Sequence, residues 1–149
     1  MAIAGPYPVF DNKFKIGKAG STSADADMVI VKEMGTFSVS IDGTIEEWTP
    51  MDEAGWTRRM STGKGFTVSL SGKRYVGDPG NDYVADLAWK TGVDCCSKLE
   101  WEFPSGAKLA CDVIVDVKTP GGGDSTNVDK IEFDLLSNGK PTYTPAPTA

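Results

Sequence analysis

Hydrophobic and polar residues alternate with a period of two along several stretches of the chain after residue 27. Because successive side chains of a strand point to opposite faces of a sheet, each stretch predicts a strand with one apolar and one polar face. The stretches run through residues 37–42, 44–49, 66–71, 98–103, 112–117 and 131–136. Strands of this kind favour an antiparallel β-sandwich or barrel, and so we expect a mainly β protein.

Glycine-containing segments predict two turns within this pattern. The dipeptide Asp42-Gly43 is typical of a tight hairpin turn between the first two strands. Residues 62–65 (TGKG) look like the end of a phosphate-binding loop. That motif requires Gly where this chain has Arg58, and Ser or Thr where it has Gly65. The segment therefore favours a turn rather than a phosphate site.

One short amphipathic helix is predicted over residues 82–90. Asn81 or Asp82 is a plausible N-cap, and Gly92 is a suitable stop. Apolar residues recur at the i, i+3 and i+4 spacing of a helix face, and these are Val84, Leu87 and Ala88. We expect the helix to pack against one face or the edge of the sheet.

The two ends of the chain lack a regular period. Residues 1–27 combine Gly, Ala, Ser, Pro and Lys with scattered aromatic residues, which favours an extended N-terminal arm that docks on another surface. Residues 140–149 form a tail rich in Pro and Thr. We therefore expect the β-domain to span residues 28–139, with long loops at residues 51–65 and 120–128.

The charge balance of the chain is acidic. Its 149 residues carry 21 Asp and Glu against 15 Lys and Arg, which gives a net charge of −6 and a pI near 4.6. A conventional nucleic-acid binder carries a basic stripe that neutralises phosphates, so this class is disfavoured. No apolar run approaches the ~18 residues of a membrane span, and none follows a basic stretch in residues 1–20. We expect no membrane association and no secretory signal.

The chain has no histidine and three cysteines, Cys95, Cys96 and Cys111. Without histidine, neither a Ser-His-Asp triad nor a Cys-His pair can form, so an enzyme would depend on carboxylates, Lys, Tyr or a bound metal. Three thiolates also fall short of the four protein ligands of a structural zinc site. We therefore expect reduced thiols that act as small apolar residues, with no disulfide.

Carboxylates project from the polar faces of three predicted strands. They are Glu100, Glu102, Asp112, Asp116, Glu132 and Asp134. Two interpretations stay open: these acids solvate an outer sheet face, or they form an acidic wall that several copies of the chain place around a channel. The adjacent pair Glu46 and Glu47 does not suit glycoside hydrolysis, because neighbouring strand residues point to opposite faces.

Several longer segments together resemble one protein family. The segments are AGPYPVFDNKFKIG (residues 4–17), SVSIDGTIEEWTPM (38–51), GWTRRMSTGKGFTVSLSGKR (55–74), GDPGNDYVADLAWKTG (77–92), PGGGDSTNV (120–128) and SNGKPTYTP (137–145). In this order they are similar to the major tail tube protein of long-tailed, non-contractile bacteriophages of Gram-positive hosts. The resemblance covers essentially the whole chain.

The resemblance implies a β-sandwich or barrel with a flanking helix that forms hexameric rings. The rings stack into a hollow tube between the capsid connector and the tail tip, and double-stranded DNA passes through it without specific binding. The implied partners are further copies of the chain, the tape measure protein, the tail terminator and the distal tail protein. The implied location is the virion tail, assembled in the bacterial cytoplasm. The family brings no catalytic motif and no cofactor, so the six carboxylates are candidates for lining the lumen.

Three other functions compete with this one. The inner tube of a contractile phage-like particle or bacteriocin shares the fold. A secreted carbohydrate-binding β-sandwich would suit the four Trp residues and the acidic pI, and a hydrolase would depend on carboxylates. Neighbouring genes separate the contractile inner tube from the non-contractile tail tube. A sheath gene indicates a contractile particle, and a tape-measure gene without a sheath gene indicates a non-contractile tail.

Overall fold

The fold is mainly β, with eight strands and one short α-helix among residues 5–147, which the computed structural model describes. The strands are β1 (Lys13–Gly17), β2 (Met28–Ile30), β3 (Met34–Trp48), β4 (Arg58–Lys73), β5 (Cys96–Glu102), β6 (Lys108–Thr119), β7 (Lys130–Ser137) and β8 (Thr142–Thr144). The helix α1 spans Pro79–Asp86. Short 3-10 turns are η1 (Val9–Asp11), η2 (Gly20–Thr22), η3 (Asp25–Asp27), η4 (Met51–Glu53), η5 (Leu87–Trp89) and η6 (Gly92–Cys95).

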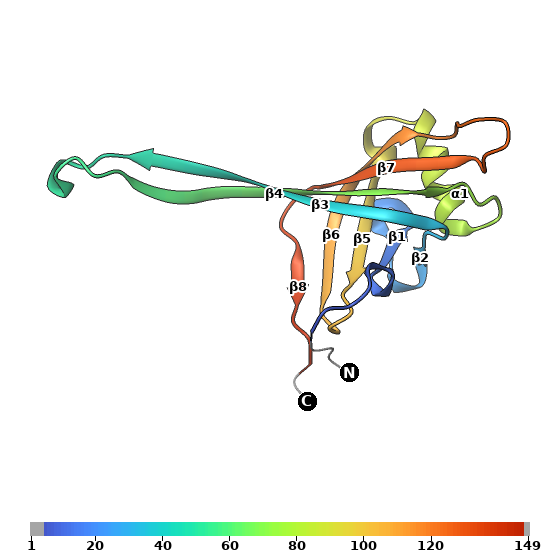
Figure 1. Cartoon of the computed structure of the whole chain (residues 1–149), viewed down its shortest axis with the longest axis horizontal. Coiled ribbons are helices and arrows are strands. Elements are labelled where there is room, and N and C mark those ends of the chain that lie inside the picture. Colours follow the sequence, from blue (N-terminus) through green and yellow to red (C-terminus); the bar gives the residue numbers. More distant parts are fainter. Residues whose placement is uncertain (1–4, 148–149) are drawn as a thin grey trace.

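All strands pair antiparallel in one continuous sheet, in the order β2-β1-β5-β6-β7-β4-β3, with β8 added to β6. In Figure 1, strands β1, β5 and β6 run across the direction of β3, β4 and β7. The sheet thus folds over on itself, and its two halves enclose the core as the layers of a sandwich do. The predicted antiparallel β architecture with one short helix is confirmed.

The core joins the two halves of the folded sheet. Phe37 of β3 lies 4.7 Å from Phe14 of β1 and 5.8 Å from Trp101 of β5, measured between ring centroids. The buried core residues are Phe14, Ile16, Val31, Val68, Leu70, Val84, Leu87, Leu99, Cys111, Val113, Val115, Ile131, Phe133 and Leu135. The apolar positions of the predicted strands after residue 98 therefore face inward, as their alternation indicated.

The helix begins earlier than predicted, because Asp78 and not Asn81 or Asp82 is its N-cap. The Asp78 carboxylate accepts a hydrogen bond of 3.0 Å from the Asn81 backbone N–H. Pro79 follows at the first helical position, where its fixed φ fits and its missing N–H costs nothing. The helix ends at Asp86 and continues as η5, and Val84 and Leu87 are buried against the sheet.

The N-terminal segment differs from the predicted arm. Residues 13–17 form β1, which lies inside the sheet and pairs with both β2 and β5. Only Phe14 and Ile16 alternate in so short a strand, a pattern too brief to predict β structure without the partner strands. The predicted tail likewise contains β8, paired with residues 108–110 of β6. Residues 1–4 and 148–149 of these two predictions lie outside the described residues.

The first hairpin turn also differs from the prediction. Gly43 lies within β3, paired with Lys64 of β4, so neither Asp42-Gly43 nor residues 62–65 form a turn. The chain reverses instead over residues 49–57, where Ala54 and Gly55 have the positive φ angles of 52° and 87°. The expected long loop at residues 51–65 therefore shrinks to this tip, whereas the loop at 120–128 is present between β6 and β7.

The three cysteines are free thiols, as expected, and Cys111 is buried on the apolar face of β6. Burial raises the pKa of the Cys111 thiol. We predict that replacing Cys95 and Cys96 by Ser and Cys111 by Ala lowers the free energy of unfolding by about 1 kcal/mol, through the small cavity at Cys111. Urea denaturation checks this, and a midpoint that shifts with reducing agent in the native protein would contradict it.

Candidate functional site

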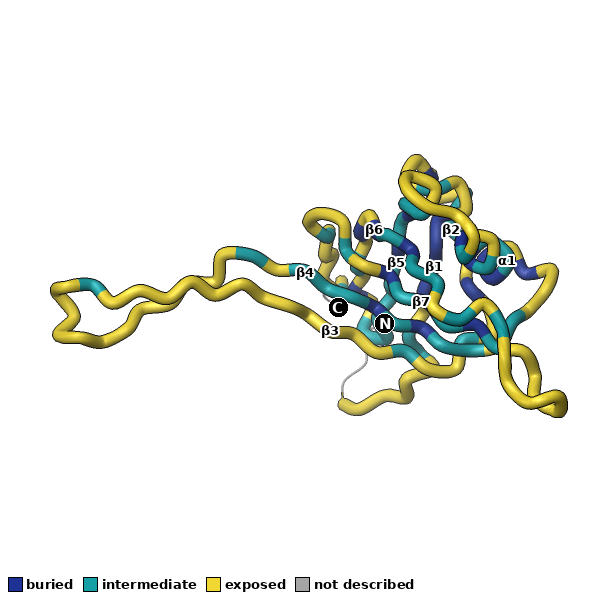
Figure 2. The backbone as a smooth tube through the Cα atoms, turned by 90° about the horizontal axis from the view of Figure 1, so that it is seen from above, coloured by how far each residue is buried: buried dark blue, intermediate teal, exposed yellow. Residues whose placement is uncertain are grey.

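The hairpin formed by β3 and β4 projects far from the rest of the molecule (Figure 1). Strand β4 also pairs with β7, but only over residues 67–73, and β3 pairs only with β4. Beyond this point the hairpin has two strands and no third neighbour among the described residues. Figure 2 shows that almost all of this extension is exposed. An isolated two-stranded hairpin is at best marginally stable in water, so a hairpin of this length is expected to be covered by a partner.

Large apolar side chains are exposed along the whole hairpin. They are Val39, Ile41, Ile45, Trp48, Met51, Trp56 and Met60. Surface apolar residues that occur singly need no explanation, but a contiguous set on one element marks an interaction surface. The pattern of β3 therefore alternates as a strand with a buried face does, although no part of residues 5–147 buries its outer half.

Two cross-strand pairs keep the hairpin in register. The Arg59 guanidinium donates to the Glu47 carboxylate at 2.6 Å, and this hydrogen bond and charge raise the pKa of Arg59. Arg58 lies over the Trp48 ring, 6.0 Å from its centroid. Glu46 pairs with Met60 and Glu47 pairs with Arg59 in consecutive positions of the ladder. The two adjacent carboxylates therefore point to opposite faces of the hairpin, as expected.

A groove of about 680 Å³ lies where the hairpin leaves the body. The hairpin contributes Val39, Ile41 and Phe66, and the body contributes Trp101 and Leu109. These side chains continue the core outward along the inner face of the hairpin. The groove is therefore an apolar surface at the junction of the hairpin and the body.

The six carboxylates proposed from the sequence all lie on the sheet face opposite the core, but they fall into two groups. Asp112 pairs with Lys98 between β5 and β6, next to Glu100 and Glu102 on β5. Asp116 pairs with Asp134 between β6 and β7, with Glu132 two residues along β7. Asp112 and Asp116 lie four residues apart on the same face of β6, so the two groups meet on this strand. The first group extends from β6 onto β5, and the second extends from β6 onto β7.

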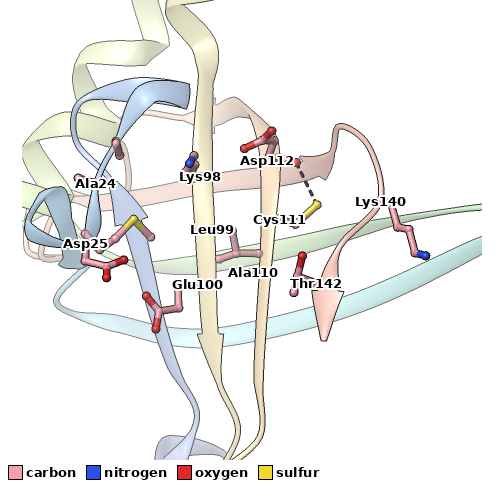
Figure 3. A pocket seen from close by; sticks show the side chains of 12 residues that line it. Ala24, Asp25, Lys98, Leu99, Glu100, Ala110, Cys111, Asp112, Lys140 and Thr142 are labelled. Carbon is pink, nitrogen blue, oxygen red and sulfur yellow. Dashed lines mark hydrogen bonds between the residues drawn. The ribbon is translucent and has the colours of Figure 1, made fainter. Parts of the chain in front are cut away.

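Glu100 and Asp112 of the first group line a trough on the polar face of β5 and β6, shown in Figure 3. The trough has a volume of about 290 Å³ and is bounded by η3 on one side and by Lys140 and β8 on the other. The carboxylates of the first group lie among lysines: Glu102 pairs with Lys15 at 3.3 Å, and Lys108 lies 3.8 Å from both Glu100 and Glu102. This side of the sheet is therefore of mixed charge and not an acidic wall.

The second group belongs to a face rich in hydroxyl groups. Asp134 pairs with Ser69 across β4 and β7, and the Ser71 hydroxyl donates to Glu132 at 3.4 Å. Lys118 contacts Asp116 at 2.6 Å, which raises the pKa of Lys118. Six Ser and Thr side chains of β3 and β4 share this face through the ladder: Thr36, Ser38, Ser40, Thr67, Ser69 and Ser71. We call this surface the hydroxyl face.

Two kinds of site are not found in the described part of the chain. No group of three or more His, Cys, Asp or Glu side chains in residues 5–147 is placed to hold a metal ion. No helix within the same residues is long and apolar enough to cross a membrane.

Comparison with known proteins places this architecture. No protein-family model matches the chain, and no curated protein sequence matches it. Several solved structures, however, are similar to this chain. A chain from the tail of an empty gene transfer agent particle, refined with helical C6 symmetry, superposes with a TM-score of 0.71 at 10% identity, over 94% of this chain and 100% of the other. A chain from the native gene transfer agent virion gives 0.69 at 12% identity, over 94% and 100%. This chain has a tail tube fold.

A third similar structure widens this comparison. The tube-terminating cap of an anti-feeding prophage matches with a TM-score of 0.60 at 12% identity, over 98% of this chain and 95% of the other. The first of these structures is a tail with C6 symmetry, the second is a virion, and the third is a cap that terminates a tube. Identities this low leave the fold as the shared property.

Proposed function

We propose that this protein is the structural subunit of the tail tube of a long-tailed, non-contractile bacteriophage of a Gram-positive host. Six copies form a ring, rings stack into a tube, and the tube conducts double-stranded DNA into the host during ejection. The protein performs no catalysis and uses no cofactor. One observation carries the proposal: a tail tube fold over 94% of the chain, with a projecting apolar hairpin that a monomer leaves uncovered.

The physical basis for assembly lies in the open edges and the hairpin. Strands β2 and β3 end the sheet, and within residues 5–147 each has one row of backbone groups without a strand partner. Such edges pair readily with another chain. A head-to-tail contact that closes gives a ring, and one that does not close gives an extended stack. The tape measure protein, tail terminator and distal tail protein are the further partners that the proposed role requires.

Electron microscopy of the purified protein tests this function. We expect hollow tubes with sixfold symmetry, in particular after the protein is concentrated or seeded with tail tips. A protein that stays monomeric or dimeric under all of these conditions would contradict the proposal.

We further propose that the hydroxyl face lines the lumen, with Asp116, Glu132 and Asp134 as its acids. B-DNA carries one negative charge per ~1.7 Å of axis, so a basic wall would hold it through many released counterions. A wall of hydroxyl groups and a few carboxylates does not bind the DNA phosphates in this way. Repulsion acts only within the screening length of about 8 Å, so it keeps the DNA away from the wall without blocking entry.

Charge reversal tests this assignment of the lumen. Phage carrying Asp116→Lys and Asp134→Lys should eject DNA at least several-fold more slowly, because four added charges per subunit attract the polymer. The matched control is Glu100→Lys with Asp25→Lys, which makes the same charge change in the trough of Figure 3 and should leave ejection unchanged. Equal effects of the two pairs, measured as ejection rate from particles with normal tails, would refute the assignment.

A second candidate function is the inner tube of a contractile phage-like particle. The similarity to the tube-terminating cap of an anti-feeding prophage favours it. The gene neighbourhood separates the two, since a sheath gene beside the coding gene supports this second function.

A further inference from the structure

The chain has four asparagines, and only Asn138 is followed directly by glycine. Glycine has no Cβ atom, so the backbone nitrogen of Gly139 can come close to the side chain of the residue before it. The Asn138 side chain ends in an amide, and a nitrogen nucleophile can attack the amide carbon, Cγ. The dipeptide therefore places a nucleophile beside an electrophile in consecutive residues.

The dipeptide lies at the start of the link between β7 and β8. Strand β7 stays paired with β6 up to residue 137, and β8 begins its pairing with β6 at residue 142. The link of residues 138–141 therefore lies outside the ladder. The Asn138 backbone N–H donates to the carbonyl of Asp112 at 2.8 Å, and both residues of the dipeptide are exposed. The backbone is thus fixed just before the reacting groups, and water reaches them.

The two reacting groups are not engaged elsewhere. Within residues 5–147, neither the Gly139 N–H nor the Asn138 side-chain amide has a hydrogen-bond partner. Gly139 has a φ of 113°, and a Cβ built on it would meet nothing within 4 Å, so the space around it is open. The N–H is therefore free to lose its proton, and the amide is free to rotate towards it.

The other asparagines lack this combination. Asn81 is buried, and its amide makes three hydrogen bonds. The Asn12 side chain is bonded to two neighbours. Asn127 is exposed, but the next residue is Val128, whose branched side chain crowds the backbone nitrogen. Exposure, a following glycine and a free amide thus coincide only at Asn138 in the described part of the chain.

We propose that Asn138 is a site of spontaneous deamidation in the folded protein, and asparagine is among the thermolabile residues of proteins. The Gly139 nitrogen loses its proton and bonds to Cγ of Asn138, and the bond from Cγ to Nδ2 breaks. The leaving nitrogen takes up a proton and departs as ammonia, which leaves a cyclic succinimide. Water then opens the ring. Addition of water at Cγ gives aspartate, and addition at the backbone carbonyl carbon of residue 138 gives isoaspartate.

Both products change the surface more than the fold. Each adds one negative charge to the net charge of −6, because a carboxyl of this type has an ordinary pKa of about 3.9. The charge appears beside Gly139 and Lys140, which line the apolar groove at the base of the hairpin. Isoaspartate also adds one carbon atom to the main chain, and this atom falls in the link of residues 138–141, outside the ladder. This inference goes beyond the proposed tail tube function and does not depend on it.

Storage of the purified native protein in neutral buffer at the growth temperature of the host tests the site. Peptide mass spectrometry follows the conversion of each asparagine, and an isoaspartyl methyltransferase with labelled S-adenosylmethionine measures isoaspartate. We expect conversion of Asn138 to exceed that of Asn127 at least several-fold in the same sample. The variant Asn138→Gln should lose the methyl label, because its longer side chain closes a larger ring more slowly. The matched control Asn127→Gln should keep the label.

Each outcome decides the proposal. Label that grows with storage and depends on Asn138 supports it. Conversion of Asn138 no faster than that of Asn127, or label that persists in Asn138→Gln, overturns it. Conversion that occurs in urea but not in the folded protein also overturns it, because the fold would then protect the dipeptide. Both substituted positions are exposed, so both variants should fold, which circular dichroism checks. Tubes are counted in a separate experiment, so none of these results alters the proposed function.

Discussion

Tube formation is expected to stop completely when residues 43–64 are replaced by Asn-Gly, while the shortened protein still folds. Asp42 pairs with Gly65 in the ladder, so a two-residue turn closes the hairpin at this point without changing its register. The variant removes the outer hairpin with Ile45, Trp48 and the tip, and it leaves the core untouched because no core residue lies in the deleted segment.

Two measurements make this expectation specific. The free energy of unfolding should stay within about 1 kcal/mol of the native value, because exposed residues contribute little to stability. Tubes counted by electron microscopy should be absent at concentrations where the native protein forms them. A matched control exchanges Glu47→Arg with Arg59→Glu, which keeps the hairpin and its cross-strand ion pair and should still form tubes. Native tube yield from the shortened variant would exclude the hairpin as an assembly element.

The variant Asn81→Ala is expected to lose about 3 kcal/mol of folding stability. Asn81 is completely buried, and its amide nitrogen donates to the carbonyls of Lys32 at 3.1 Å and Lys73 at 3.0 Å. Its amide oxygen accepts from the Arg74 guanidinium at 2.8 Å. Truncation leaves these three partners without their bonds, and each unsatisfied buried group costs about 1–3 kcal/mol, less where water reaches it.

The position of Asn81 explains why one side chain has so large an effect. It connects the first turn of α1 to the segment before β3 and to the last residue of β4, and the neighbouring Asp78 carboxylate adds a hydrogen bond from the Lys32 N–H at 3.1 Å. Urea denaturation gives the measurement. The control Asp86→Ala removes an exposed side chain from the same helix and should change stability by no more than about 0.5 kcal/mol. A loss below 1 kcal/mol for Asn81→Ala would contradict the expected role.

Alternation alone predicted the strands of the second half of the chain and their inward faces. Leu99, Val113 and Phe133 are buried as their positions required, since each strand there has polar neighbours on one face and the core on the other. The same signal did not predict β1, whose two apolar residues are too few for a period. Its strand structure depends on hydrogen bonds to β5, which lies more than 80 residues away in the chain.

Local turn propensity predicted a reversal at Asp42-Gly43 that does not occur. Gly43 stays extended because the ladder between β3 and β4 continues on both sides of it, from Met34 to Trp48. Pairing along fifteen residues outweighs the preference of a single dipeptide, and the turn moves to Ala54 and Gly55. No feature of the dipeptide itself distinguishes these two outcomes.

The amino-acid sequence is enough to predict a mainly β chain, polar and apolar residues on opposite strand faces, and six carboxylates on the polar face. These properties follow from side-chain alternation, which is local. The folding over of the sheet, and the strand neighbours of each carboxylate, with Lys98 beside Asp112 and Asp134 beside Asp116, came only from the tertiary structure. It also decided that the outer half of β3 leaves the body and exposes residues such as Ile45. Both depend on contacts between strands that are distant in the chain, and such contacts leave no period in the sequence.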